Sequence, residues 1–149
     1  MTGVQTCALP IYRVQFTFLD ERNSVVQYAE PLHYLYEPNA SILKAGAFRF
    51  IGKQFNLFKL HVNTHLYTSI DLVENFPGRV FKILMTNPKE TDLRKYFPDG
   101  KANVATRNYP LNADELKKKL KLKDGGELFL FGVTGSQIFL LVTRKISEL

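Results

Sequence analysis

The chain has 149 residues, of which 45% are hydrophobic, 13% are aromatic and 23% are charged. This composition is typical of a folded, soluble protein and excludes a disordered or fibrous chain. No stretch approaches the roughly twenty consecutive apolar residues of a membrane-spanning helix, so we expect no membrane partner.

The formal net charge of +6 is distributed unevenly. Residues 12–78 contain six basic and six acidic side chains, whereas residues 79–149 contain fourteen basic and eight acidic ones. The whole net charge therefore belongs to the C-terminal half. A basic excess of this kind indicates an anionic partner.

The first eleven residues, MTGVQTCALPI, have no charge, the single cysteine and no periodicity. They lack the basic residues and the sustained apolar run of a signal peptide. They look like the translation of a common short-read sequencing adapter, so we predict that residues 1–11 are an artefactual leader outside the fold, at the start of the tail of a longer protein; a frayed N-terminus is the alternative. On this prediction Cys7 has no role as nucleophile, disulfide or metal ligand.

Residues 12–78 form the first predicted unit. Polar and apolar side chains alternate at its start, which predicts a hairpin of two strands. Asn39 precedes an apolar stripe at helical spacing and is expected to cap a helix. A turn at Phe76, Pro77 and Gly78 ends the unit. The predicted elements are strand, turn, strand, helix and one or two strands, over residues 13–19, 20–23, 24–29, 40–55 and 57–67.

Residues 79–149 form the second predicted unit, with the order β-α-β-α-β-β. Asn87 and Asn112 are expected to cap its two helices. The last two strands are almost entirely apolar and form a hairpin across Gly135 and Ser136, so we expect them to be central and covered on both faces. The fold class is therefore α+β, with a small mixed sheet and helices packed on it. The predicted elements cover residues 79–85, 89–96, 102–108, 113–122, 127–134 and 137–145.

The sequence LKKKLKLK, at residues 116–123, is the strongest charge signal. Lys118 and Lys119 each follow an acidic residue by four positions, which is typical of a solvated helix face. The other lysines have no such partner, and with basic residues elsewhere in the unit they predict a surface that binds the phosphates of RNA. The candidate contacts are Lys101, Arg107, Lys117, Lys121, Lys123 and Arg144.

The sequence LHVNTHLYTS, at residues 60–69, has polar or aromatic side chains at every second position. In an extended strand they would form one face, which could meet a substrate or another domain. A network of satisfied structural polar groups is the alternative. A metal-dependent enzyme that uses two histidines is a third possibility, but zinc needs three or four ligands, so we expect no metal. The row consists of His61, Asn63, His65 and Tyr67.

No catalytic constellation is present in the sequence. There is no glycine-rich phosphate or dinucleotide loop and no nucleophile elbow. The pair Asn87 and Pro88 is followed by Lys89 and Glu90, not by the residues of the Asn-Pro-Pro-Tyr loop of amino-group methyltransferases. We therefore predict no catalytic residue in this chain.

Three stretches carry a family resemblance: YLYEPNASILKAGAFRFIGKQFNLFKLHVNTHLYTS (34–69), ENFPGRVFKI (74–83) and KANVATRNYPLNADELKKKLKLKDGGELFLFG (101–132). They resemble the C-terminal portion of a bacterial family of class I S-adenosylmethionine-dependent methyltransferases. In that family a Rossmann-like catalytic domain precedes a ferredoxin-like segment and a THUMP-like domain. The chain departs from the family at Val62, where a proline is common, and in the shortness of its last hairpin.

The resemblance implies that residues 12–78 are the end of the ferredoxin-like segment and residues 79–149 the THUMP-like domain. It also implies that the catalytic domain, which would bind S-adenosylmethionine, is missing from this chain. THUMP domains proper bind RNA in tRNA-modifying enzymes. We therefore expect the substrate-recognition part of a cytoplasmic methyltransferase of structured RNA, either tRNA or rRNA, with no cofactor of its own. The alternative is a scaffold that braces a methyltransferase domain acting on a substrate other than RNA.

Overall fold

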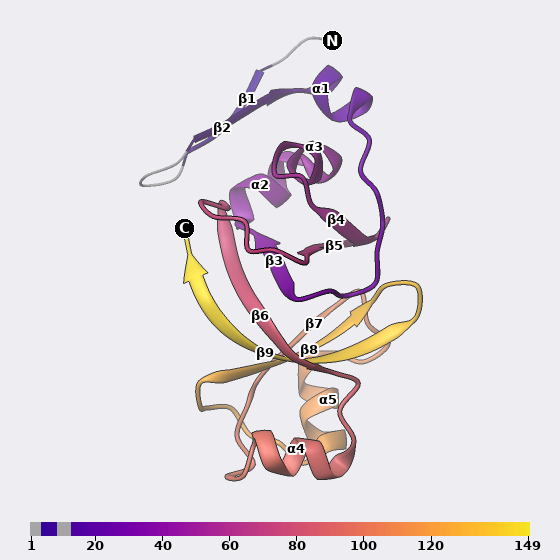
Figure 1. Cartoon of the computed structure of the whole chain (residues 1–149), viewed down its shortest axis with the longest axis vertical. Helices are drawn as coiled ribbons and strands as arrows, with labels where there is room; N and C mark the ends of the chain where they lie inside the picture. The colour runs from indigo at the N-terminus through magenta and orange to yellow at the C-terminus, as the bar shows by residue number, and fades with distance from the viewer. Residues whose placement is uncertain (1–3, 9–12) are drawn as a thin grey trace.

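The computed structural model describes residues 4–8 and 13–149. Strands β1 (Val4–Ala8) and β2 (Arg13–Thr17) form a two-stranded antiparallel sheet. This sheet lies over α2 and α3, at the end of the molecule farthest from α4 and α5 (Figure 1). Part of the predicted leader, residues 1–3 and 9–11, lies outside the described residues, and its origin as an artefact stays a prediction.

The prediction of a hairpin over residues 13–29 is wrong. Its first strand is followed at once by a helix, α1 (Phe18–Asn23). Thr17 and Asp20 form a capping box, in which each side chain accepts a hydrogen bond from the backbone N–H of the other, at 3.0 and 2.8 Å. The chain then runs along the main sheet and pairs with it at one isolated bridge instead of forming a strand.

The main sheet has seven strands in the order β4-β5-β3-β6-β9-β8-β7. All neighbours are antiparallel except β7 and β8, which are parallel. The predicted mixed α+β fold is confirmed. The strands are β3 (Tyr34–Pro38), β4 (Phe58–His61), β5 (Thr64–Ser69), β6 (Gly78–Thr86), β7 (Asn103–Arg107), β8 (Leu128–Thr134) and β9 (Ile138–Glu148).

The single helix predicted over residues 40–55 is two helices, α2 (Ala40–Ala45) and α3 (Phe48–Gln54). Asn39 caps α2 as predicted, because its Oδ1 accepts a hydrogen bond from the backbone N–H of Ile42 at 3.1 Å. Gly46 ends α2 in the left-handed conformation with φ 76°, where glycine pays no steric penalty. The continuous apolar stripe in the sequence conceals this break.

The C-terminal part, residues 78–149, has the predicted order β-α-β-α-β-β, with helices α4 (Glu90–Tyr96) and α5 (Ala113–Leu120). Asn112 caps α5 as predicted. Asn87 does not cap α4, which begins after Lys89; it lies at φ 52° and its Oδ1 accepts a hydrogen bond from the backbone N–H of Leu140 at 3.0 Å. Asn87 therefore fixes the end of β6 to β9.

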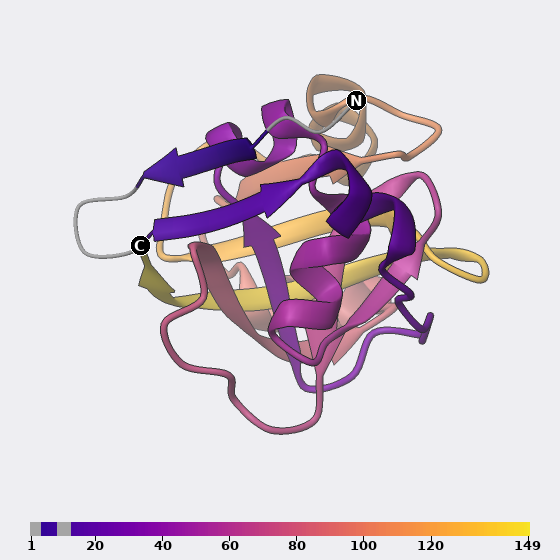
Figure 2. The same ribbon diagram turned by 90° about the horizontal axis from the view of Figure 1, so that it is seen from above.

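The seven-stranded sheet bends so strongly that one of its faces folds onto itself (Figures 1 and 2; Figure 2 gives the view from above). Tyr36 and Leu35 are neighbours on β3 but belong to different core clusters, because successive strand residues point to opposite faces. Leu130 and Phe131, which are neighbours on β8, also belong to different core clusters. The outer face carries α2 and α3 at one end and α4 and α5 at the other, and the inner face encloses the central cluster. The central cluster consists of Leu35, Leu60, Leu66, Phe81, Phe131, Val133, Phe139 and Leu141.

The two predicted units share this sheet. Strands β3 and β6 pair over five residues, from Tyr34 opposite Lys82 to Pro38 opposite Gly78. The central cluster takes side chains from both units, so neither half has a core that is complete without the other. The exact division at residue 78 stays a prediction.

Candidate nucleic-acid interface

Exposed basic side chains are concentrated in the C-terminal part of the molecule. Of the fourteen Lys and Arg in residues 79–149, nine have no ion pair among the residues that the structure describes, and all nine are exposed. This part of the surface can therefore attract an anionic partner. The nine are Lys82, Lys89, Lys95, Lys101, Lys118, Lys119, Lys121, Lys123 and Arg144.

Lys117, one of the predicted phosphate contacts, is already paired. Its Nζ lies 3.0 Å from Asp114 Oδ1 and 3.1 Å from Asp124 Oδ1, and its side chain is 19% exposed. The hydrogen bonds that the Lys117 ammonium donates to these carboxylates, first of all to Asp114, raise its pKa. Two acidic groups neutralise this lysine, so its charge is less available to a phosphate than that of the exposed lysines, and its role as a phosphate contact stays a prediction.

An open groove of about 690 Å³ lies between helices α4 and α5. Its lining includes two exposed lysines, Lys119 and Lys121, and also Arg94, which pairs with Glu90 at 3.1 Å. The groove therefore combines an apolar lining with positive charge. The apolar residues that line it include Leu93, Phe97, Leu120, Leu122 and Leu140.

Lys121 ends α5 in the left-handed conformation, with φ 58°. The following residue, Leu122, packs against the core cluster beneath the helices, while Lys121 stays exposed. Lys119 was expected to pair with Glu115. Instead the Glu115 carboxylate accepts a hydrogen bond from the backbone N–H of Asn112 at 3.0 Å, as part of the capping box. Lys119 is therefore a further candidate phosphate contact, beyond those predicted from the sequence.

Lys101 and Lys123 lie side by side next to this groove. Their backbones form a parallel bridge, in which the N–H of Lys123 donates to the carbonyl oxygen of Gly100 at 2.8 Å and the N–H of Ala102 donates to that of Lys123 at 2.9 Å. Both lysines are exposed. With Lys121 they form a group of three predicted contacts that the structure brings together.

Arg144 lies elsewhere, on β9, directly opposite Lys82 on β6. It is four residues along the strand from Leu140 in the groove, which corresponds to about 13 Å. Arg144 is exposed and forms no ion pair with any described residue. The predicted contacts therefore do not all belong to one surface.

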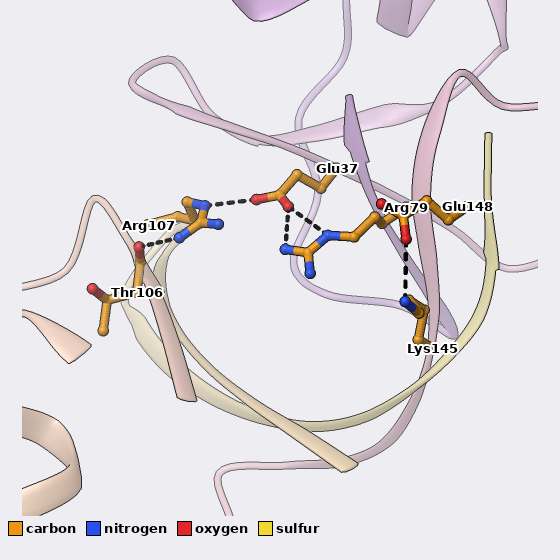
Figure 3. Close-up of polar contacts among 6 residues, drawn as sticks. All are labelled: Glu37, Arg79, Thr106, Arg107, Lys145 and Glu148. Atoms are coloured by element: carbon orange, nitrogen blue, oxygen red, sulfur yellow. Dashed lines mark hydrogen bonds and ion pairs between the residues drawn. The ribbon is translucent and has the colours of Figure 1, made fainter. Parts of the chain in front are cut away.

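Arg107, the remaining predicted contact, joins the two parts of the molecule (Figure 3). Its Nε donates to Glu37 Oε2 at 2.6 Å, while Arg79 donates to Glu37 Oε1 from Nε at 3.0 Å and from Nη2 at 2.5 Å. The Glu37 side chain is only 10% exposed. The Arg79 guanidinium also lies 5.2 Å from the centre of the Phe81 ring. One buried carboxylate thus holds two arginines, and Arg107 has a structural partner.

The polar row lies in a hairpin of two strands, which is one of the two alternatives predicted for residues 57–67, and not on one extended strand. β4 ends at His61, residues 62 and 63 form the turn, and β5 begins at Thr64. Lys59 stabilises this turn, because its Nζ donates to the carbonyl oxygens of His61, Val62 and Thr64 at 2.6, 3.0 and 2.9 Å. Burial lowers the pKa of the Lys59 amine to about 8.

Tyr67 and His65 pack on helix α3 and do not form an open polar surface. Tyr67 is fully buried and its hydroxyl donates to the carbonyl oxygen of Phe48. The His65 ring stacks on the Phe48 ring with centroids 3.7 Å apart. Burial, helped by the charge of Lys59, lowers the pKa of His65, and its buried Nδ1 has no hydrogen-bond partner among the residues that the structure describes.

A small pocket of about 230 Å³ lies where the two parts of the molecule meet. Asn63 and His65 of the predicted row and Arg107 of the predicted basic set all line it. Phe48 and Asn108 also line the pocket; no sequence pattern indicated them, because they come from segments that are distant in the sequence. Members of the predicted polar row and of the predicted basic set therefore meet in one pocket.

Among residues 4–8 and 13–149, no three His, Cys, Asp or Glu side chains gather in a way that could hold a metal ion. None of the helices in the described ranges is both long enough and apolar enough to cross a membrane.

Comparisons with known proteins agree with this architecture. Residues 34–77 match the model of a ferredoxin-like domain, and residues 78–145 match the model of a THUMP domain-like family. The chain is similar to the crystal structure of a "putative methyltransferase" from Porphyromonas gingivalis W83, with 33% identity and a TM-score of 0.82. The match covers 98% of this chain and 38% of that protein. No curated protein matches the chain. The chain thus contains a ferredoxin-like and a THUMP-like domain.

Proposed function

We propose that this chain is the RNA-recognition portion of an S-adenosylmethionine-dependent RNA methyltransferase of the cytoplasm, with tRNA or rRNA as substrate. S-adenosylmethionine would bind to a catalytic domain outside this chain. The similarity to a longer protein described as a "putative methyltransferase" supports this division, because the chain corresponds to 38% of that protein. This chain would present the RNA and carry out no chemistry itself.

The observation that carries the proposal is the basic groove between α4 and α5. It lies within the THUMP-like domain. Lys119 and Lys121 line it, Lys101 and Lys123 lie beside it, and none of these exposed lysines has an ion pair with a described residue. Ammonium groups on a concave apolar surface favour a polyanion with exposed bases, because the phosphates meet the charges and the bases cover the apolar lining.

Binding of bulk tRNA in a salt series tests the proposal. We expect the logarithm of the binding constant to fall linearly with the logarithm of the salt concentration, with a slope of several units. Changing Lys119 and Lys121 to Gln should lower this slope by about two units. Changing Lys117 to Gln, a matched control on the same helix, should alter it much less, because that lysine is neutralised by Asp114 and Asp124. A wild-type slope near zero would contradict the proposal that this chain binds RNA.

A scaffold role is the second candidate, and one observation favours it. Glu37 of the ferredoxin-like domain binds Arg79 and Arg107 of the THUMP-like domain through a nearly buried carboxylate, within one shared sheet. Such a rigid unit could brace a neighbouring domain. In this case bulk tRNA would bind weakly and without dependence on Lys119 or Lys121.

A further inference from the structure

Lys82 and Arg144 form an unusual pair in the middle of the sheet. They are register partners on the antiparallel strands β6 and β9. Directly opposite residues on such strands point to the same face, with their Cβ atoms about 5 Å apart. Two basic side chains therefore start from neighbouring positions on the same face of the sheet.

Within residues 4–8 and 13–149, no carboxylate pairs with either of these two cations. Both side chains are exposed, and neither forms an ion pair or a hydrogen bond with a described residue. A second close pair of cations, Arg79 and Arg107, by contrast shares the carboxylate of Glu37. Like charges that are directly opposite each other destabilise a sheet, so the uncompensated pair costs stability in the free protein.

The surroundings of the pair fit an external anion. The same row across the sheet continues with Tyr34 on β3 and Leu128 on β8, which are the partners of Lys82 and Arg144 on their other sides. Tyr34 packs against the cluster beneath α2 and α3, and Leu128 packs against the cluster beneath α4 and α5. The two cations are thus exposed on the strip of the outer face between the two pairs of helices.

We propose that Lys82 and Arg144 bind a phosphate group, which in the RNA complex is a backbone phosphodiester bound outside the α4–α5 groove. The guanidinium can donate two parallel hydrogen bonds to phosphate oxygens, and the ammonium adds a mobile point charge. The identity of the ligand as RNA rests on the proposed function. The site itself, as a receptor for a phosphate group, does not depend on it.

The RNA test compares wild type with K82Q/R144Q and with K44Q/K53Q in the tRNA salt series. The control removes the same charge from two exposed lysines on α2 and α3. We expect the salt slope of K82Q/R144Q to be smaller by about two units and that of the control to be unchanged. Equal slopes for K82Q/R144Q and wild type would overturn the inference, while the groove variant K119Q/K121Q still tests the proposed function separately.

A wild-type protein without salt-dependent tRNA binding would contradict the proposed function, and inorganic phosphate then decides the inference. We expect phosphate to raise the melting temperature of wild type and of K44Q/K53Q above that in chloride of equal ionic strength, and to leave K82Q/R144Q unchanged. An equal shift of the melting temperature in all three proteins, or no shift in any, would overturn the proposal of a phosphate site.

Stability in the absence of ligand provides a second measurement. If the pair is an unoccupied anion site, K82Q/R144Q unfolds at a higher temperature than wild type in low salt, and the difference shrinks as salt screens the repulsion. A structural role for the pair predicts the reverse order, with the variant less stable at every salt concentration, and this result would contradict the inference.

Discussion

Arg107 and Glu37 are 70 residues apart in the sequence, yet the Arg107 Nε donates to the Glu37 Oε2 at 2.6 Å. This contact connects the end of β7, an edge strand of the sheet, to β3, which belongs to the ferredoxin-like domain. With Arg79 on the other oxygen, the carboxylate fixes the bend of the sheet. A single nearly buried acid therefore links the two domains, in addition to the sheet and the central cluster that they share.

Replacing this acid should lower stability. In E37Q the two guanidinium groups face each other without a counter-charge, and we expect the free energy of unfolding to fall by about 3 kcal/mol, as when one partner of a buried ion pair is removed. Urea denaturation followed by circular dichroism measures the loss. E148Q is the control, because its exposed pair with Lys145 should contribute less than about 1 kcal/mol. Equal stabilities of the two variants would contradict the structural role of Glu37.

Lys59 should make stability depend on alkaline pH. Burial lowers the pKa of its amine from 10.5 to about 8 in the folded protein. Between these values the unfolded chain holds a proton that the folded protein has released, so the free energy of unfolding rises with pH, by at most about 1.4 kcal/mol per pH unit.

Urea denaturation between pH 7.5 and 9.5 checks this prediction. Relative to K59M, wild type should gain stability across the range, whereas K53M, which removes an exposed lysine, should follow the wild-type curve. If K59M does not fold, the titration of the Lys59 amine in wild type by NMR provides the same information. A midpoint near 10.5 would show the prediction to be wrong.

Much of the fold could be predicted because its signals are local. Asn112 precedes Glu115 by three residues, and this spacing defines both the start of α5 and its capping box. The last hairpin could also be predicted, because both of its strands are almost entirely apolar. The capping box of Thr17 and Asp20 was equally local, but the alternation before it favoured a hairpin, and this prediction was wrong.

The site was less predictable, because helical spacing does not decide which of two local partners a side chain takes and because other contacts join distant residues. Glu115 was assigned to Lys119 from helical spacing, but the capping box uses its carboxylate. Lys117 was predicted to be free, but it pairs with Asp114 three residues before it, and the turn after α5 brings Asp124 to it as a second partner. The position of Lys82 opposite Arg144 depends on the strand order, which no local pattern contains.

His65 should make stability depend on mildly acidic pH. Burial lowers the pKa of its imidazole below the ordinary 6.5, so the unfolded chain takes up a proton first as the pH falls. The stability that the neutral ring contributes is therefore present above pH 6.5 and is lost progressively below it. H65F should keep the stacking on Phe48 and lose less stability between pH 7.5 and 5 than wild type.

The matched control for His65 is H33Q, which removes an exposed histidine. Its urea midpoints should fall with pH as those of wild type do. Parallel curves for H65F and wild type would indicate that His65 is protonated equally easily in both states.

Gly78 should be intolerant of any side chain. It pairs with Pro38 where the two domains join, and a Cβ atom there would meet the backbone carbonyl oxygen of Glu37 and lie 2.9 Å from the Cα of Pro38. Both obstacles are backbone atoms of β3, so no side-chain rotation relieves the clash, and β3 and β6 must separate. We expect G78A to lose about 3 kcal/mol of stability, at the upper end of the usual cost of overpacking.

G46A is the control for this change, since Gly46 lies in open space and its φ of 76° costs alanine only about 1 kcal/mol. Because the central cluster takes side chains from both domains, separation of β3 from β6 should expose both together. Limited proteolysis of G78A should therefore cut the ferredoxin-like and THUMP-like domains at the same rate. Survival of a resistant THUMP-like fragment would mean that this domain folds without its neighbour, and that the bend held by Glu37 joins two independent units.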